Sequence, residues 1–440
     1  MQRRGIVQAE SAGAMARLAV AALLAGCAGS AGAAGFALQE QSASGFGNAF
    51  AGEAALAQDA STVFSNPAGM PFLPGPQVLL GVAVIDSSIK FSNNGSSIPA
   101  LATATGSQPG GNGGNAGGVF PPPIFYGTLP VGDRVSLGFG VNVPFGLQTV
   151  YDDDWIGRFQ GIKSELTAIN YNAAVAYKIT NDISVGLGVN YQFLQTDLTN
   201  AVATPFGEGR TGITAQDAAW GWNVGALFQV SANTRIGVSY RSRLNYDLQG
   251  TVNTTFASSG TPVPGGSFAA TASVAFPDVF TLGVTQRLGD KWDVLGGVTF
   301  TRWDVLQQIN IVNTATNTIA QQLIANFRNA WRLSLGVNNH LSENWILRGG
   351  IAWDQTPQQD QFRTVRLPDN DRYWLAVGAG YHPTKNLSFD VGYAYIWFPT
   401  TSINMTQTQP GVSAALGTST VNGEYKNFAN VLSAQVSYTF

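Results

Sequence analysis

An alternation between two kinds of side chain is clearest in Leu387-Ser388-Phe389-Asp390-Val391-Gly392-Tyr393-Ala394-Tyr395-Ile396-Trp397. Every second residue from Leu387 to Trp397 is apolar or aromatic, whereas the residues between them are mostly small or polar. Because successive side chains of a strand point to opposite faces, this period of two predicts a strand with one apolar face. The same period recurs in 183–193 and in 331–337. The sequence therefore predicts an all-β protein.

Alternation alone fits both a soluble sandwich and a membrane barrel, and the connections distinguish the two. Tight polar turns alternate with long segments rich in Gly, Ser, Thr, Asn and Pro, as in outer-membrane barrels, whose turns are short on the periplasmic side and long outside. The turns are Gly132-Asp133, Asn181-Asp182, Ala232-Asn233, Gly289-Asp290, Ser342-Glu343 and Thr384-Lys385. The long segments are 87–118, 149–165, 199–217, 251–271, 310–327, 356–370 and 400–424.

These connections join fourteen predicted strands, so residues 77–440 are expected to form a 14-stranded antiparallel transmembrane β-barrel. Fourteen is even, which puts both ends of the barrel on the periplasmic side. The predicted strands are 77–86, 119–130, 134–148, 166–180, 182–198, 218–230, 234–250, 272–287, 291–309, 328–340, 343–355, 371–382, 386–399 and 426–440.

The composition excludes several other classes of protein. Only 11% of the 440 residues are charged, against about 25% in an average soluble domain. The one long apolar run, 18–28, is shorter than the roughly 20 residues that a spanning helix needs, which excludes a helical membrane protein. A net charge of −3 offers no basic surface to nucleic acid.

Catalytic chemistry has few residues to draw on. Cys27 is the only cysteine, and His340 and His382 are the only histidines. One cysteine cannot form an intrachain disulfide or a cysteine metal cluster. Both histidines border predicted periplasmic turns and have no obvious partner. The sequence predicts neither an enzyme, nor a metal site, nor a bound cofactor.

The N-terminus has the order of a secretory signal. Arg3, Arg4 and Arg17 precede the apolar run, and Ala31-Gly32-Ala33 follows it as a cleavage site. We expect residues 1–33 to be removed, with Met15 an alternative start to Met1. Leu24-Ala25-Gly26-Cys27 also fits a lipoprotein site, which would leave Cys27 acylated; otherwise Cys27 is discarded with the signal.

The strand ends carry features of membrane barrels. Trp292, Trp345, Tyr381 and Trp397 suit aromatic girdles at the two interfaces, although each could equally be a packing residue. The chain ends in Phe440 on an alternating strand, which resembles the signal read by the barrel-assembly machinery.

Residues 34–76 show no sustained alternation and are too apolar for a floppy tail. Because a barrel of this width has a lumen that its own side chains cannot fill, we expect this segment to form a hatch that plugs it. A periplasmic tail or a soluble helix pair is the alternative. Charges at inward positions are costly unless paired or wet, so most are expected to clamp the hatch to the wall. They are Arg302, Arg332, Arg348, Arg363, Arg366, Asp369, Asp371 and Arg372.

Several motifs resemble the long-chain fatty acid transporter family (FadL and TodX type). In the hatch segment they are Glu40-Gln41-Ser42-Ala43-Ser44-Gly45, Asn48-Ala49-Phe50-Ala51-Gly52 and Asn66-Pro67-Ala68-Gly69-Met70. Later ones are Asp154-Trp155-Ile156-Gly157-Arg158-Phe159, Ala219-Trp220-Gly221-Trp222-Asn223, Ser239-Tyr240-Arg241-Ser242 and Leu367-Pro368-Asp369-Asn370-Asp371-Arg372-Tyr373-Trp374. The resemblance spans nearly all of the mature chain.

The resemblance implies a 14-stranded barrel with an N-terminal hatch that imports hydrophobic molecules. The hatch residues it singles out are Phe36, Asn66, Pro67, Ala68 and Gly69. It also implies a kinked third strand through which ligand leaves sideways into the bilayer. Proline cannot donate a ladder hydrogen bond and glycine weakens pairing, so Pro144, Phe145 and Gly146 are predicted to form this kink. An ordinary bend near a loop is the alternative.

The resemblance favours a long-chain fatty acid as the cargo. Burying each CH₂ in an apolar pocket gains roughly 0.8 kcal/mol, so such a chain could be captured without ATP. Aromatic hydrocarbons are the alternative within the family, and a general diffusion porin is a more distant one. Arg158 or Arg328 could pair with a carboxylate, or simply hold a loop. The side chains expected to line an outer groove are Trp155, Phe159, Ile309, Ile311 and Leu323.

The expected partners are a hydrophobic ligand and the lipid and lipopolysaccharide of a Gram-negative outer membrane. The resemblance implies a monomer.

Overall fold

The computed structural model describes residues 35–258 and 261–440. The predicted signal peptide, the alternative start at Met15 and the lipoprotein site at Cys27 lie outside the described residues. Twenty strand segments form a single antiparallel sheet. Six pairs of segments are consecutive parts of one wall strand, so the described wall has the fourteen strands that the sequence predicts.

The bounds of the strands follow the chain. They are β1 (Gln77–Asn93), β2 (Val119–Phe120) with β3 (Pro123–Val131), β4 (Val135–Val150), β5 (Lys163–Lys178), β6 (Ile183–Thr204), β7 (Gly207–Ser231), β8 (Thr234–Arg241) with β9 (Leu244–Ser258), β10 (Thr261–Phe276) with β11 (Val279–Leu288), β12 (Trp292–Thr301) with β13 (Gln308–Asn313), β14 (Thr318–Ile324) with β15 (Ala330–His340), β16 (Trp345–Asp354), β17 (Arg372–Tyr381), β18 (Leu387–Trp397) with β19 (Thr401–Thr408), and β20 (Thr418–Thr439).

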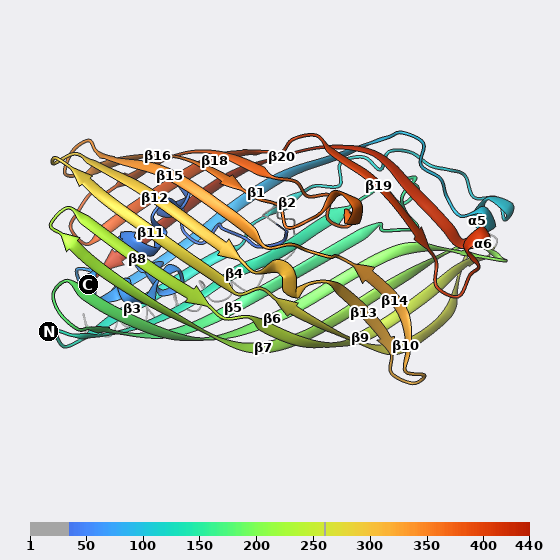
Figure 1. Ribbon diagram of the computed structural model, residues 1–440, viewed down its shortest axis with the longest axis horizontal. Coiled ribbons are helices and arrows are strands. Elements are labelled where there is room, and N and C mark those ends of the chain that lie inside the picture. Colours follow the sequence, from blue (N-terminus) through green and yellow to red (C-terminus); the bar gives the residue numbers. More distant parts are fainter. Residues whose placement is uncertain (1–34, 259–260) are drawn as a thin grey trace, which may run out of the picture.

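The barrel closes where the first strand meets the last. β1 pairs with β20 along its whole length, from Gln77 opposite Thr439 to Asn93 opposite Gly423. This pairing leaves neither terminal strand with a free edge, as a membrane barrel requires. The strands run obliquely along the long axis of the molecule, and the C-terminus lies at one end of it (Figure 1).

The six tight turns lie where the sequence predicts them, and they define a short-turn end of the barrel. The predicted loops at the opposite, long-loop end are wrong in part. Much of 199–217, 251–271, 310–327 and 400–424 is hairpin rather than loop. The alternation of apolar and polar residues is weak in these hairpins because threonines occupy many positions. In the pairs Thr211–Thr254 and Thr408–Thr418 the two hydroxyls are hydrogen-bonded to each other.

Strand register places outward-facing aromatic residues in a row near the long-loop end. Phe280 pairs with Phe300, and Phe300 pairs with Trp331. Farther around the wall, Tyr373 pairs with Trp397. At the short-turn end, exposed side chains repeat the pattern, among them Trp292, Trp345, Tyr381 and Phe440. Two aromatic levels separated by an apolar belt are typical of a barrel in a membrane.

The N-terminal segment (35–76) folds into short helices that contact the inner wall. Asn66 donates to the carbonyl of Ala226 on β7 at 3.1 Å, and Ser184 on β6 donates to the carbonyl of Ala68 at 2.5 Å. No helix in the described parts of the chain is long and apolar enough to cross a membrane. The helices are α2 (Ala43–Phe46), α3 (Glu53–Leu56), α4 (Thr62–Ser65) and the 3₁₀ helix η1 (Pro67–Phe72), and in the loops α5 (Ala100–Ala104), α6 (Ala414–Gly417), η2 (Trp303–Val305) and η3 (Asp360–Phe362).

Glycines on successive wall strands let this segment approach the sheet backbone. A Cβ at Gly237 would overlap the carbonyl oxygen of Ala54, and a Cβ at Gly378 would lie 2.6 Å from the Cα of Gly47. A larger residue at either position would push the segment off the wall. The wall glycines in such contact are Gly186, Gly225, Gly237, Gly283, Gly297, Gly336, Gly350, Gly378 and Gly392.

We expect Gly237→Val to unseat the N-terminal segment, because overpacking costs about 1–3 kcal/mol and the carbonyl of Ala54 cannot move freely. Proteolysis of 43–56 in folded barrels should then become at least several-fold faster. Gly296→Val is the matched control, because a Cβ at Gly296 meets only Leu335, at 4.0 Å. Equal proteolysis of both variants would contradict the close-packing explanation.

Candidate functional site

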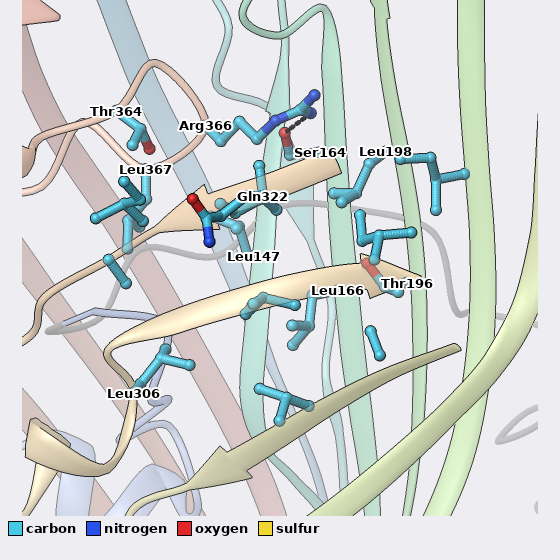
Figure 2. A pocket seen from close by; sticks show the side chains of 18 of the residues that line it. Leu147, Ser164, Leu166, Thr196, Leu198, Leu306, Gln322, Thr364, Arg366 and Leu367 are labelled. Atoms are coloured by element: carbon cyan, nitrogen blue, oxygen red, sulfur yellow. Dashed lines mark hydrogen bonds between the residues drawn. The ribbon is translucent and has the colours of Figure 1, made fainter. Parts of the chain in front are cut away.

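An apolar cavity of about 420 Å³ lies inside the barrel, toward the long-loop end. Leucines from several strands and loops surround it, including Leu147, Leu166, Leu198 and Leu306, as Figure 2 shows. Arg366 stands at one edge of the same view, with a hydrogen bond to Ser164. The cavity can therefore hold a largely apolar molecule beside one cationic group.

A reversal of polarity along the strands creates this cavity. In the first part of β6 the inward positions are polar or small, as at Ser184 and Gly188, and the outward ones are apolar. Farther along the same face, the inward positions become Leu194 and Leu198, which line the cavity. On β9 the inward Leu248 likewise alternates with polar outward residues. Beyond the membrane, the apolar face thus turns from lipid to lumen.

Phe36 closes one side of the cavity. Its ring lies 4.7 Å from that of Trp303 and 5.0 Å from that of Phe276, measured between centroids. Phe145 on β4 lies 6.0 Å from Phe36 and 4.7 Å from Phe276. Phe36 therefore connects the cavity to the third wall strand.

The third wall strand, β4, is irregular at the predicted kink. Its register with β5 shifts between Asn142 and Phe145, so Val143 and Pro144 are skipped. Its pairing with β3 stops at Val141. The N-terminal segment takes over this edge: Leu38 donates to the carbonyl of Pro144 at 2.8 Å, and Gly146 donates to the carbonyl of Phe36 at 2.9 Å. On the side where β3 has ended, Pro144–Gly146 thus contact Phe36–Leu38, whereas on the other side Phe145 and Gly146 still pair with β5.

An ion pair anchors the residue before Phe36. Asp369 accepts a hydrogen bond from the amide of Gly35 at 2.9 Å and forms an ion pair with Arg372 at 2.5 Å. Arg372 also donates to the carbonyl of Gly35 at 3.4 Å. Both side chains are buried, so their charges are largely compensated by each other.

Among the buried arginines in the described part of the chain, Arg366 and Arg332 form no ion pair with a carboxylate, and of these two only Arg366 lines the cavity. Its guanidinium donates to Ser164, to Asn200 and to backbone carbonyls, and its Nε has no hydrogen-bond partner. Burial lowers the pKa of Arg366 to about 10, so the group stays protonated at neutral pH. A buried cation without a counter-ion is available to an anionic ligand.

The residues predicted to bind ligand lie in different settings in the two loops. Ile309, Ile311 and Leu323 line the cavity. Trp155 is fully buried in a separate cluster, stacked on Tyr151 at 3.9 Å. Arg158 pairs with Glu208 at 2.8 Å. The segment around Trp155 folds as a packed unit, so its aromatic residues stabilise the loop.

Two more predicted residues lie outside the main cavity. Phe159 lines a second cavity of about 400 Å³, which shares Ile213 and Gln407 with the first and lies farther toward the long-loop end. Arg328 is exposed and donates to the carbonyl of Thr356 at 3.4 Å. Sequence reasoning missed the inward leucines of β5, β6 and β9, although the reversal of alternation after Phe193 is a signal that could have revealed them.

The predicted hatch residues Asn66, Pro67, Ala68 and Gly69 lie together against β6 and β7. Asn66 caps η1 by accepting from the amide of Ala68, and Pro67 occupies the first helical position, where its missing N–H costs nothing. Unlike Phe36, these residues do not line the cavity.

The charges expected to clamp this segment divide into two groups. Arg332 donates to the carbonyl of Ala49 at 2.7 Å, and Asp369 and Arg372 bind Gly35. Elsewhere, Arg302 is half exposed beside Asp278, and Arg348 pairs with Asp390. Arg363 and Asp371 bond within the long-loop end. Within the described residues, no group of three or more His, Cys, Asp or Glu side chains is arranged to hold a metal ion.

A model of one protein family matches residues 24–440, and its description is outer membrane protein transport protein (OMPP1/FadL/TodX). The chain belongs to this family. Its members are transport proteins of the outer membrane, and the barrel described above places this protein in the outer membrane of a Gram-negative bacterium.

Two relatives illustrate the similarity in sequence. Outer membrane protein P1 of Haemophilus influenzae is 32% identical, over 92% of this chain and 95% of the relative. The long-chain fatty acid transport protein of Escherichia coli K12 is 29% identical, over 84% of this chain and 89% of the relative.

Solved structures share the fold. A Pseudomonas aeruginosa FadL homologue superposes with a TM-score of 0.84 at 23% identity, over 92% of this chain and all of the homologue. The Pseudomonas putida toluene transporter TodX gives a TM-score of 0.65 at 16% identity, over 87% of this chain and 94% of TodX.

We expect Ala272→Trp to abolish binding of a neutral hydrophobic fluorophore such as pyrene, because Ala272 lines the cavity and an indole would fill much of it. Pyrene fluorescence, titrated against purified protein, measures the affinity, which should fall at least tenfold. Ser273→Trp, one residue along on the opposite face of β10, is the control and should bind normally. Unchanged binding in Ala272→Trp would place the binding site elsewhere.

Proposed function

We propose that this protein imports long-chain fatty acids across the outer membrane, through the cavity beside Phe36 and out of the barrel wall at β4. The observation that carries this proposal is an apolar cavity bordered by one buried cation without a counter-ion, Arg366. An apolar chain with one carboxylate matches that combination, and no catalytic step is involved.

Capture from dilute solution follows from the lining of the cavity. Each CH₂ moved from water into it gains roughly 0.8 kcal/mol, so a chain of about sixteen carbons has ample free energy to offset the loss of its mobility. The second cavity, lined by Phe159 and Ile319, lies closer to the long-loop end than the first. Ligand would therefore reach the inner cavity from the long-loop end, which we assign to the cell exterior because outer loops are the longer ones.

Arg366 supports a carboxylate over a hydrocarbon as cargo. Desolvating a guanidinium is costly, and its free Nε offers a donor beside the apolar lining. The name of the E. coli relative points to the same cargo. TodX, a solved protein of the same fold, is named as a toluene transporter, so import of aromatic hydrocarbons is the second candidate. Ligand binding through apolar contacts alone, with no role for Arg366, would favour an aromatic hydrocarbon as the cargo.

Release at β4 would use the N-terminal segment as a hatch. Phe36 borders the cavity, and Phe36–Leu38 hold the edge of β4 where the pairing with β3 has stopped. Movement of these residues would connect the cavity to the gap between β3 and β4 and so to the bilayer. A hydrophobic molecule needs no aqueous exit, because the membrane itself dissolves it.

We expect Arg366→Gln to weaken oleate binding and uptake about tenfold, while toluene uptake stays within twofold, because only oleate carries a charge that the guanidinium can meet. Uptake of radiolabelled oleate and toluene is measured in cells that lack their own importer. Arg328→Gln, an exposed arginine outside the cavity, is the control. Equal losses for both solutes, or uptake of toluene alone by the native protein, would refute a fatty-acid carrier.

Replacing Pro144 and Gly146 by Val should restore strand pairing and close the gap beside β4, since valine can donate to the ladder and favours strands. Oleate uptake should fall more than tenfold, whereas binding to the purified protein should change little. Pro130→Val in β3 is the matched control, because β3 and β4 already pair there. Normal uptake in the Pro144 and Gly146 variant would exclude exit at this position.

A further inference from the structure

Glu40 is a buried carboxylate without a hydrogen-bond partner. It lies in the hatch (35–76), between the strand-like contact of Leu38 and the cap of α2, and its side chain is 2% exposed. Neither carboxylate oxygen has a hydrogen-bond partner among the described residues. Buried polar groups in folded proteins are almost always bonded, so Glu40 calls for a physical explanation.

Three charged residues of the wall lie on one inward row near Glu40. Arg332 on β15 is opposite Asp354 on β16, and Asp354 is opposite Arg372 on β17. All three are buried. The Nε of Arg332, the Oδ2 of Asp354 and the Nη1 of Arg372 are also without hydrogen-bond partners. We call Glu40 and these three residues the hatch lock.

Two arginines of the hatch lock are hydrogen-bonded to the backbone of the hatch. Arg332 donates to the carbonyl of Ala49 at 2.7 Å, and Arg372 donates to the carbonyl of Gly35 at 3.4 Å. The two arginines that act electrostatically on Glu40 therefore also hold two other points of the hatch. A change in the charge of Glu40 alters the field on both of these contacts.

The environment of Glu40 sets its charge. Burial raises the pKa of Glu40 to about 7, against the smaller opposing effects of the backbone amides of Glu40 and Gln39 and of the guanidinium groups of Arg372 and Arg332. The acid is therefore poised to gain or lose a proton near neutral pH. In a hatch that has moved into water, its pKa would return to its ordinary value of 4.5.

We propose that Glu40 is a proton-sensitive lock, which seats the hatch when it is protonated and loosens the hatch when it is ionised. The seated hatch binds this proton more tightly than the open hatch. The fraction of molecules with a seated hatch is therefore higher in acid and falls as the pH rises toward and through 7. The pKa of Glu40 is about 7 in the seated hatch and 4.5 in the open hatch. From these values, the titration of Glu40 alone should lower the ratio of seated to open molecules about tenfold between pH 6 and pH 8.

Hydrogen exchange, measured by mass spectrometry on the ligand-free protein in detergent, tests this proposal. Protection factors of amides in 43–56, corrected for the intrinsic effect of pH, should fall at least tenfold from pH 6 to pH 8. Amides in β17 and β20 should not change. In Glu40→Gln, which keeps the size and loses the titration, this fall should be about tenfold smaller than in the native protein. Glu343→Gln, in an exposed turn, is the control.

A second acid of the hatch must be separated from Glu40. Glu53 in α3 is half-buried, its pKa is raised by burial to about 7, and it faces Arg332 and Arg241. In Glu53→Gln a change of about tenfold should remain. A flat profile in Glu53→Gln, or an unchanged slope in Glu40→Gln, would overturn the assignment to Glu40.

A direct titration keeps the test decisive if Glu40→Gln does not fold. The ¹³C-carboxyl signals of glutamate in Glu53→Gln, where Glu53 cannot contribute, should include one that titrates near pH 7 together with hatch protection, and its absence would overturn the proposal. The proposal rests on the hatch and not on the cargo. Hydrogen exchange needs no ligand, so a failure of fatty-acid uptake would leave this result unaffected.

Discussion

The backbone of a strand in a bilayer must find all of its hydrogen bonds within the protein, and the rest of this structure depends on that constraint. A closed barrel satisfies it, through the seam between β1 and β20. The strand pairing that satisfies this constraint is interrupted where β4 loses β3 beyond Val141. There the hatch supplies the missing partners from Phe36 and Leu38. The wall break and the hatch are therefore one structural unit, because moving the hatch leaves the edge of β4 unpaired.

Closing fourteen strands leaves a lumen that side chains of the wall cannot fill, and its two levels are filled differently. Near the short-turn end the wall offers glycines, so the backbone of the hatch packs directly on the sheet. Toward the long-loop end the strands extend past the apolar belt and their inward faces turn apolar, as at Leu194 and Leu248. The level toward the long-loop end is only partly filled, and the space that remains is the cavity. Phe36 lies where these levels meet.

Charges inside the lumen are organised by burial, since each isolated charge would be costly. Asp369 with Arg372 and Asp390 with Arg348 form pairs, and the first of these pairs also holds Gly35. Several other buried charged groups have no ion pair among the described residues, and Arg366 and Glu40 are two of them. Arg366 borders the apolar cavity as a cation, and Glu40 lies in the hatch as an acid whose charge depends on pH. The proposed roles in ligand recognition and hatch position thus fall to separate groups.

The sequence by itself determined the barrel, because a period of two and the rhythm of short and long connections are local properties. It also predicted an irregularity in β4, since proline cannot donate to a ladder and glycine weakens strand pairing. Only the tertiary structure decided which loop side chains face the cavity. Trp155 and Arg158 have the composition of a binding loop, yet they pack against Tyr151 and Glu208, whereas Ile309 and Leu323 reach the cavity. Which side of a loop is covered depends on residues distant in sequence. The charge of Glu40 depends on such residues too, because strand register alone brings Arg332 and Arg372 together.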